Sequence, residues 1–164
     1  MKNLSLLRYT LYLFVLPLVS CSNKDEDASP MSTSHNVAVH VTGENLLPKL
    51  GANLQIYATQ RRDGVVTSTL IAQKNYTGSI DTTYTLGTLA GMNALHTDAV
   101  SVRTLFLGCG AGGYIPPADS KLTASIIVDG KTTMSVTLDQ SQKGTYVTND
   151  LFLTGSILQE LHKL

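Results

Sequence analysis

The stretch that decides the fold is residues 54–72, LQIYATQRRDGVVTSTLIA. Apolar and polar residues alternate over residues 54–59, and a second run after Asp63-Gly64 carries Val66, Ser68, Leu70 and Ala72 at one parity. Strict alternation is typical of half-buried β-strands, and the Asp-Gly pair between the runs is typical of a turn. The stretch therefore predicts a β-hairpin.

Parity predicts the loop of this hairpin. A two-residue loop, Asp63-Gly64, would set the even-numbered apolar residues of the first strand against odd-numbered residues of the second. Cross-strand partners share a face, so that arrangement would mix the core with the surface. We therefore expect a three-residue loop, Arg62-Asp63-Gly64, with Ile56 opposite Leu70 and Leu54 opposite Ala72, and Gly64 in the left-handed conformation.

The same argument applies around Val128-Asp129-Gly130. Apolar residues alternate before this stretch, and a Thr- and Val-rich run follows it. A three-residue loop would set Leu122, Ala124 and Ile126 opposite Val136, Met134 and Thr132. We expect both hairpins to have the same construction.

Further strands are predicted over residues 37–41, 82–89, 99–107 and 146–154. About eight short strands separated by Gly, Asn, Asp and Pro predict an all-β fold, an antiparallel β-sandwich with a general likeness to immunoglobulin- and transthyretin-like sandwiches. Ser156 and Gln159 have capping-box spacing, and the apolar residues at 157, 158, 161 and 164 fit one helical face. They predict a short C-terminal helix that covers an end of the sandwich, or alternatively binds a partner.

Composition limits the class of protein. Residues 28–36 carry Ser, Thr and Pro without an apolar pattern, so the folded part is a single β-sandwich domain over residues 36–164. That domain has nine Lys or Arg and nine Asp or Glu, and its longest basic run is Arg61-Arg62. A nucleic-acid-binding protein needs several basic side chains that neutralise phosphates, so no nucleic acid is expected as a partner.

The N-terminus carries a targeting signal. Lys2 and Arg8 precede an uncharged, mostly apolar run over residues 9–19, which suits the core of a secretory signal and is too short to span a membrane. Leu18-Val19-Ser20-Cys21 then resembles the lipobox of bacterial lipoproteins. The resemblance implies that residues 1–20 are a signal peptide and that Cys21 becomes acylated and N-terminal. The alternatives are an ordinary secretory signal and an uncleaved anchor.

Residues 21–35 are predicted to form a flexible, acidic and Ser-rich tether. Ser22 stands where an Asp would resemble an inner-membrane retention signal, so the resemblance favours the outer membrane. The cluster Lys24-Asp25-Glu26-Asp27 resembles the export signal of surface lipoproteins, and it is equally explained as a solvated charge run. We expect a lipid anchor in the outer membrane, with the cell surface and the periplasmic face left open.

The sequence predicts no cofactor and no metal site. The run Gly108 to Gly113 contains the spacing GxGxxG, but Pro116-Pro117 follows it where a nucleotide-binding site needs a helix. We therefore interpret it as a loop between strands. Cys109 lacks the spacing of a metal ligand, and we expect a buried small residue, with intermolecular pairing as the alternative.

Few residues are candidates for chemistry. His96-Thr97-Asp98 is predicted to be a local polar turn, and His35 to lie in the tether. Tyr57 lies on the polar parity of its strand and Tyr114 in the glycine-rich loop, so these two are the candidate ligand-binding residues. The leading hypothesis is a non-catalytic binding or structural module with a glycan or protein as ligand. The alternative is a hydrolase-like envelope enzyme whose site is assembled from loops.

Overall fold

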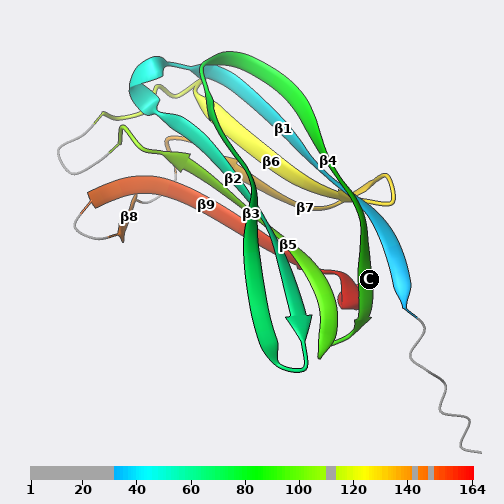
Figure 1. Cartoon of the computed structure of the whole chain (residues 1–164). Coiled ribbons are helices and arrows are strands. Elements are labelled where there is room, and N and C mark those ends of the chain that lie inside the picture. The colour runs from blue at the N-terminus through cyan, green and yellow to red at the C-terminus, as the bar shows by residue number, and fades with distance from the viewer. Residues whose placement is uncertain (1–31, 110–113, 142–143, 148–149) are drawn as a thin grey trace, which may run out of the picture.

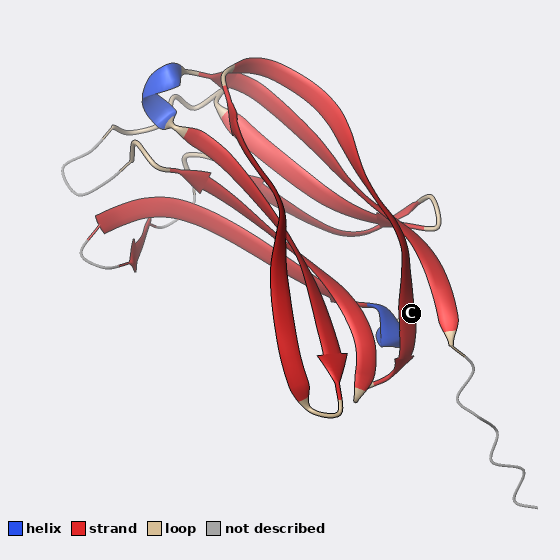
Figure 2. Cartoon of the chain, in the orientation of Figure 1, coloured by secondary structure: helices blue, strands red, loops and turns tan. Residues whose placement is uncertain are grey.

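Strands make up most of the described structure (Figure 2). The computed structural model describes residues 32–109, 114–141, 144–147 and 150–164. Within these ranges the elements are β1 (Thr33–Leu46), η1 (Pro48–Leu50), β2 (Ala52–Arg62), β3 (Val65–Tyr76), β4 (Gly78–Asn93), β5 (His96–Phe106), β6 (Lys121–Val128), β7 (Lys131–Leu138), β8 (Gly144–Val147), β9 (Asp150–Glu160) and η2 (Leu161–Lys163), where η marks a 3₁₀ turn. Neighbouring strands pair antiparallel, so the predicted all-β class is confirmed.

Strand β5 joins the two halves of the molecule because both of its edges are paired. One edge pairs with β2, which in turn pairs with β3. The other edge forks: residues 96–97 pair with the end of β4, whereas residues 99–106 pair with β9. Two groups of strands leave this fork, β4-β1-β6-β7 on one side and β3-β2-β5-β9-β8 on the other (Figure 1). The described strands thus form one connected sheet, and the predicted division into two separate sheets is not confirmed.

The apolar core lies between these two groups of strands. Alternate residues of β1 and β6 enter it from one side, and alternate residues of β2 and β5 enter it from the other. Its largest fully buried members include Leu54, Ile56, Phe106, Leu122 and Ile126. Because strand side chains alternate, the remaining residues of each strand face outward and form two outer faces. The candidate site lies on one of them.

The first hairpin corrects the predicted loop. Arg62 pairs with Val65 across a two-residue turn, in which Asp63 and Gly64 have φ of 50° and 82°. Positive φ at both central positions is that of a type I′ turn, which matches the twist of the flanking strands. The register then shifts at a bulge, so that Tyr57 pairs with Leu70 but Ile56 pairs with Ala72. The predictions of Ile56 opposite Leu70 and of Leu54 opposite Ala72 were therefore wrong, and Leu54 pairs with Lys74. A bulge at Ile71, rather than a third loop residue, restores the parity of the core.

The second hairpin repeats this construction. Val128 pairs with Lys131 around Asp129 and Gly130, whose φ values are 49° and 79°. A bulge at Thr133 then shifts the register. Beyond it, the apolar residues 122, 124 and 126 pair with residues 138, 136 and 134. The two hairpins are alike, as predicted, but the three-residue loop and its partners were wrong here too.

The C-terminus forms a strand where a helix was predicted. β9 runs to Glu160, and only the 3₁₀ turn η2 follows it. Ile157 and Leu161 point inward while Leu158 is exposed, as a strand requires and a helical face does not. Two strands also replace the one predicted over residues 146–154, because β8 ends at Val147 and β9 begins at Asp150.

Two polar segments also differ from the prediction. β1 begins at Thr33, so His35 belongs to a strand and not to the tether. His96, Thr97 and Asp98 open β5 and do not form a turn. Thr97 and Asp98 are buried at the fork, where η2 packs against β4. A Cβ on Gly91 of β4 would lie 2.7 Å from the Leu161 carbonyl carbon, so glycine permits this close approach.

Candidate binding groove

A groove of about 450 Å³ crosses the outer face of β3, β2, β5 and β9. These four strands lie side by side in Figure 1. Outward-facing residues of all four strands line the groove: Tyr57, Thr59, Arg61, Val66, Ser68, Thr97, Ala99, Ser101, Arg103, Ser156, Leu158 and Glu160. The stretch of β5 from Thr97 to Arg103 spans about 20 Å at the usual rise per strand residue. The groove therefore suits an elongated ligand.

The bulge at Ile71 places β3 in this groove. Between the bulge and the turn, Tyr57, Thr59 and Arg61 pair with Leu70, Ser68 and Val66. Paired residues share a face, so Val66 and Ser68, which were predicted on the core parity of β3, line the groove, whereas Ala72 beyond the bulge packs against the core. The hydroxyls of Thr59 and Ser68 lie 2.8 Å apart and fix the two strands at this point.

The groove carries two arginines in different surroundings. Arg61 lies at one end, where Nη1 donates to the Ala94 carbonyl at 3.2 Å and Nη2 lies 3.6 Å from Glu160 Oε1. Arg103 is exposed and takes part in none of the ion pairs within the described part of the chain. Gln55 of β2 and Ser156 of β9 flank it in register. Its guanidinium is thus available to an anionic group of a ligand.

Glu160 is the one carboxylate among the residues that line the groove. Lys163 binds its other oxygen, Oε2. That hydrogen bond, with the charges of Lys163, His162 and Arg61, holds the pKa of Glu160 below its ordinary value. The carboxylate is ionised and already has cationic partners, so it offers no proton for acid catalysis near neutral pH. The groove keeps a positive character at Arg103.

Tyr57 and Tyr114, the two predicted ligand-binding residues, lie in different places. Tyr57 lines the groove, opposite Ser101 in register, and its hydroxyl donates to Gln55 Oε1 at 3.1 Å. Tyr114 is partly buried against the core and does not line the groove, and its backbone N–H donates to the Gly108 carbonyl at 3.3 Å. The structure therefore does not bring the two tyrosines together in this groove.

The glycine-rich loop has a packing role at its start. A Cβ on Gly108 would lie 1.8 Å from the Lys49 carbonyl oxygen, and the Gly108 N–H donates to the Leu50 carbonyl at 2.9 Å. Glycine is thus required where β5 leaves the sheet beside η1. Cys109 is buried, as expected, and burial raises the pKa of its thiol. Residues 110–113 lie outside the described residues.

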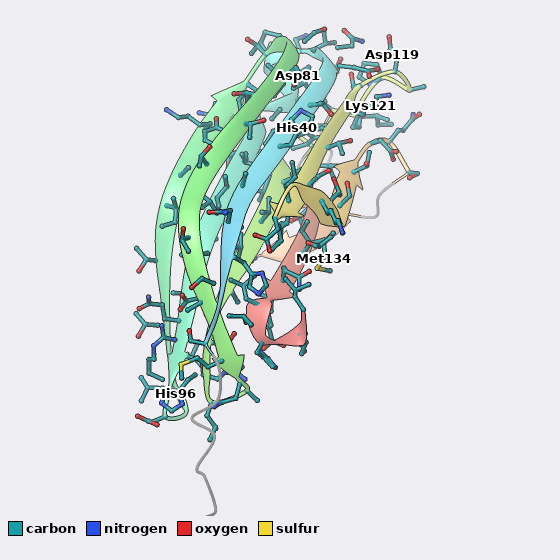
Figure 3. The ribbon with its side chains drawn as sticks, turned by 90° about the vertical axis from the view of Figure 1, so that its right-hand side faces the viewer. His40, Asp81, His96, Asp119, Lys121 and Met134 are labelled. Atoms are coloured by element: carbon teal, nitrogen blue, oxygen red, sulfur yellow. The ribbon has the colours of Figure 1, made fainter. Side chains whose placement is uncertain are left out.

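Three histidines pair with aspartates that are far away in the sequence. His35 Nδ1 lies 2.7 Å from Asp129 Oδ2, His40 Nε2 lies 2.8 Å from Asp81 Oδ1, and His96 Nε2 lies 2.9 Å from Asp63 Oδ1. Figure 3 shows His40 beside Asp81 at one end of the view and His96 at the other end. None of the three pairs lines the groove. Within the described residues, no three His, Cys, Asp or Glu side chains are placed to hold a metal ion.

Sequence reasoning found Tyr57 but missed the groove and the His–Asp pairs. The pairs join residues 33 to 94 positions apart, and no local motif marks such contacts. The polar parity of β5, with Ser101 and Arg103 facing outward, was a signal that could have indicated the groove. Its other wall depends on the bulge in β3, which has no marker in the sequence.

Comparisons with known proteins give no family: no family model, no curated protein and no solved structure matches this chain. Among the described residues, none of the helices has the length and apolar character needed to cross a membrane. The lipobox and Cys21 lie outside the described residues.

Proposed function

We propose that this chain is a lipid-anchored binding module of the outer membrane that holds an acidic glycan in the groove. The observation that carries the proposal is the combination, on one outer face, of an aromatic side chain at Tyr57, an exposed guanidinium at Arg103 and hydroxyls such as Ser101. Aromatic rings stack on the apolar faces of sugars. A guanidinium binds a carboxylate through paired charge-assisted hydrogen bonds, and hydroxyls bind sugar hydroxyls.

A non-catalytic role is favoured over the hydrolase alternative. Hydrolysis of a glycosidic bond ordinarily uses two carboxylates that flank the bond. The groove is lined by one, Glu160, which is bound by Lys163, and no histidine lines it. The anchor rests on the resemblance of Leu18-Val19-Ser20-Cys21 to a lipobox. Three acyl chains at Cys21 would hold the protein stably in a membrane, since each buried methylene contributes about 0.8 kcal/mol.

The test of binding uses the full mature protein extracted from membranes in detergent. An oligosaccharide of uronic acids and a neutral oligosaccharide of the same length are titrated against it by calorimetry. We expect binding of the acidic chain only. Arg103→Ala should weaken it by about 10- to 100-fold, because a hydrogen bond to a charged group contributes about 1.5–3 kcal/mol. Tyr57→Ser should weaken it further.

The matched control is Lys131→Ala, which removes an exposed cation at the start of β7, outside the groove. Binding by this variant should equal that of the unchanged protein. Equal binding by the Arg103→Ala variant, or release of shortened sugars during the titration, would contradict the proposed role.

The anchor is tested separately. Mass spectrometry of the mature protein should find an acylated Cys21 at the N-terminus, and Cys21→Ser should release the protein from membranes. Protease treatment of intact cells then separates the cell surface from the periplasmic face, because only a surface protein is digested. A mature chain that begins elsewhere and carries no lipid would contradict the anchor without affecting the groove.

A further inference from the structure

Strand β3 leaves one edge of the sheet open. One side of β3 pairs with β2 from Val65 to Tyr76, and within the described part of the chain no strand pairs with its other side. The strand at the opposite end of the order, β7, pairs with β6 on one side, and β9 packs against its side chains, since a Cβ on Gly155 of β9 would lie 2.6 Å from Val136 Cγ2. β3 is therefore a long edge: the backbone N–H and C=O groups on its outer side have no strand partner within the described residues.

This edge lacks the usual protection against another strand. Proteins blunt exposed edges with charged side chains, prolines, short strands or bulges. Residues 65–73, VVTSTLIAQ, contain no charge, proline or glycine, and Val66, Leu70 and Ile71 are exposed. The one protective feature is the bulge at Ile71, which leaves the part from Val65 to Leu70 regular.

The backbone groups that face outward follow from the turn. Residues in an antiparallel ladder alternate between those whose backbone groups bind the neighbour and those whose groups point away from it. Because Arg62 and Val65 close the two-residue turn, Val65 points toward β2. Val66, Ser68 and Leu70 then point their backbone groups to the open edge.

We propose that β3 pairs antiparallel with β3 of a second copy of this chain, centred on Ser68. In this register Ser68 faces Ser68 of the other copy, and Val66 faces Leu70. The outward-pointing N–H and C=O groups of Val66, Ser68 and Leu70 then form the hydrogen bonds between the two copies. The side chains of Val66 and Leu70 contact each other across the two strands. The segment carries no charge, so a two-fold arrangement sets no like charges against each other. A partner of a different sequence would gain nothing from this self-complementarity.

The pairing is closed and extends the groove. Each copy uses β3 once, and the bulge at Ile71 ends the regular ladder, so the two-fold contact does not continue into a fibre. Val66 and Ser68 line the groove, and the two-fold axis would run perpendicular to the sheet. The grooves of both copies then lie on the same side of one continuous sheet, so a longer ligand could contact both.

Disulfide trapping tests this register with the full mature protein in membranes. In a hydrogen-bonded antiparallel pair, facing Cα atoms are about 5.5 Å apart, within the range of about 4.4–6.8 Å that a disulfide spans. Ser68→Cys should therefore give a covalent dimer on a non-reducing gel. Val66→Cys is the matched control on the same exposed face. The two copies of residue 66 would be offset by four residues, about 14 Å, which is too far for a disulfide.

A second measurement uses charge. Ser68→Lys would set two like charges against each other, so native mass spectrometry should find monomer where the unchanged protein is dimeric. Thr85→Lys, exposed on β4 away from this edge, should leave the dimer intact. Equal trapping by the two cysteine variants, trapping of a different protein, or a monomer for the unchanged protein would overturn the proposal. None of these readouts uses a ligand, so their failure is distinguishable from failure of the proposed binding function.

Discussion

At the scale of single residues, Asp98 holds the fork of the sheet. Its Oδ1 accepts from Arg62 Nη2 at 2.7 Å and its Oδ2 accepts from the Ala90 N–H at 2.9 Å, so it joins β2, β4 and β5. The carboxylate is almost fully buried. Asp98→Ala should lower the free energy of unfolding by about 1–3 kcal/mol, because it leaves the Ala90 N–H without its acceptor. Urea unfolding followed by circular dichroism measures the change.

Asp119→Ala is the control for that loss. Asp119 also accepts one side-chain hydrogen bond, from Asn45 at 2.9 Å, but it lies in an exposed loop. In the Asp119→Ala variant, water can accept the hydrogen bond from Asn45, so the free energy of unfolding should change by less than about 0.5 kcal/mol. Equal destabilisation by the two substitutions would show that burial at the fork does not matter.

Asp129 should make stability depend on pH. His35 and the Asn36 N–H bind its carboxylate, and the two hydrogen bonds hold its pKa below the ordinary value. A carboxyl whose pKa is lower in the folded state stabilises the protein above its unfolded pKa, about 3.9, and loses that contribution as pH falls through the folded pKa. We expect Asp129→Asn to make the fall in melting temperature below about pH 4 less steep.

The substitution is chosen so that the turn around residue 129 keeps its conformation. Asparagine accepts positive φ, so Asp129→Asn keeps the two-residue turn with Gly130. Asp63→Asn makes the same exchange at the matching position of the other hairpin and so controls for the loss of an Asp at this turn position, with each acid transition compared with that of the unchanged protein. The same steepness in the Asp129→Asn variant would mean that other carboxyls, such as Glu160, account for the acid transition.

At the scale of elements, two leucines near the C-terminus can show whether this segment is a strand or the predicted helix. Leu161, the first residue of η2, is fully buried, whereas Leu158 is 51% exposed on the outer face of β9. A helix with the predicted apolar face would bury both. Leu161→Ala should therefore lower the free energy of unfolding by about 2–5 kcal/mol, the range for buried leucines. Leu158→Ala should lower it by less than about 0.5 kcal/mol. Comparable losses at the two positions would favour the helix.

The hairpins show what parity predicts and what it leaves open. It correctly required the even-numbered residues of β2 to oppose even-numbered residues of β3 in the core, as Ile56 and Ala72 do. A third loop residue and a bulge restore parity equally well, and Ile71 carries no sign that distinguishes them. Asp63-Gly64 did favour the two-residue turn. Similarly, Ile157 and Leu161 are four residues apart, and this spacing fits one face of a strand as well as one face of a helix.

At the scale of the whole molecule, alternation was sufficient for the all-β class but not for the topology. Buried residues of β1, β2 and β6 follow the pattern read from the sequence. The fork at Thr97 and Ala99 depends on which strand meets each edge of β5, and such pairings join residues that are distant in the chain. The groove could not be predicted from the sequence for the same reason, because it is formed by four strands, β3, β2, β5 and β9, whose pairing the sequence does not reveal.

The fork also predicts how the molecule unfolds. Both groups of strands bury side chains in one core, and β5 pairs with members of both, so neither group keeps its apolar face covered without the other. We expect a single cooperative transition in urea. Far-ultraviolet circular dichroism and tyrosine fluorescence should give the same midpoint, since Tyr57 lies in one group and Tyr84 in the other. Leu161→Ala should shift both midpoints equally. Two separate midpoints would mean that the two groups of strands unfold independently and that β5 does not couple their unfolding.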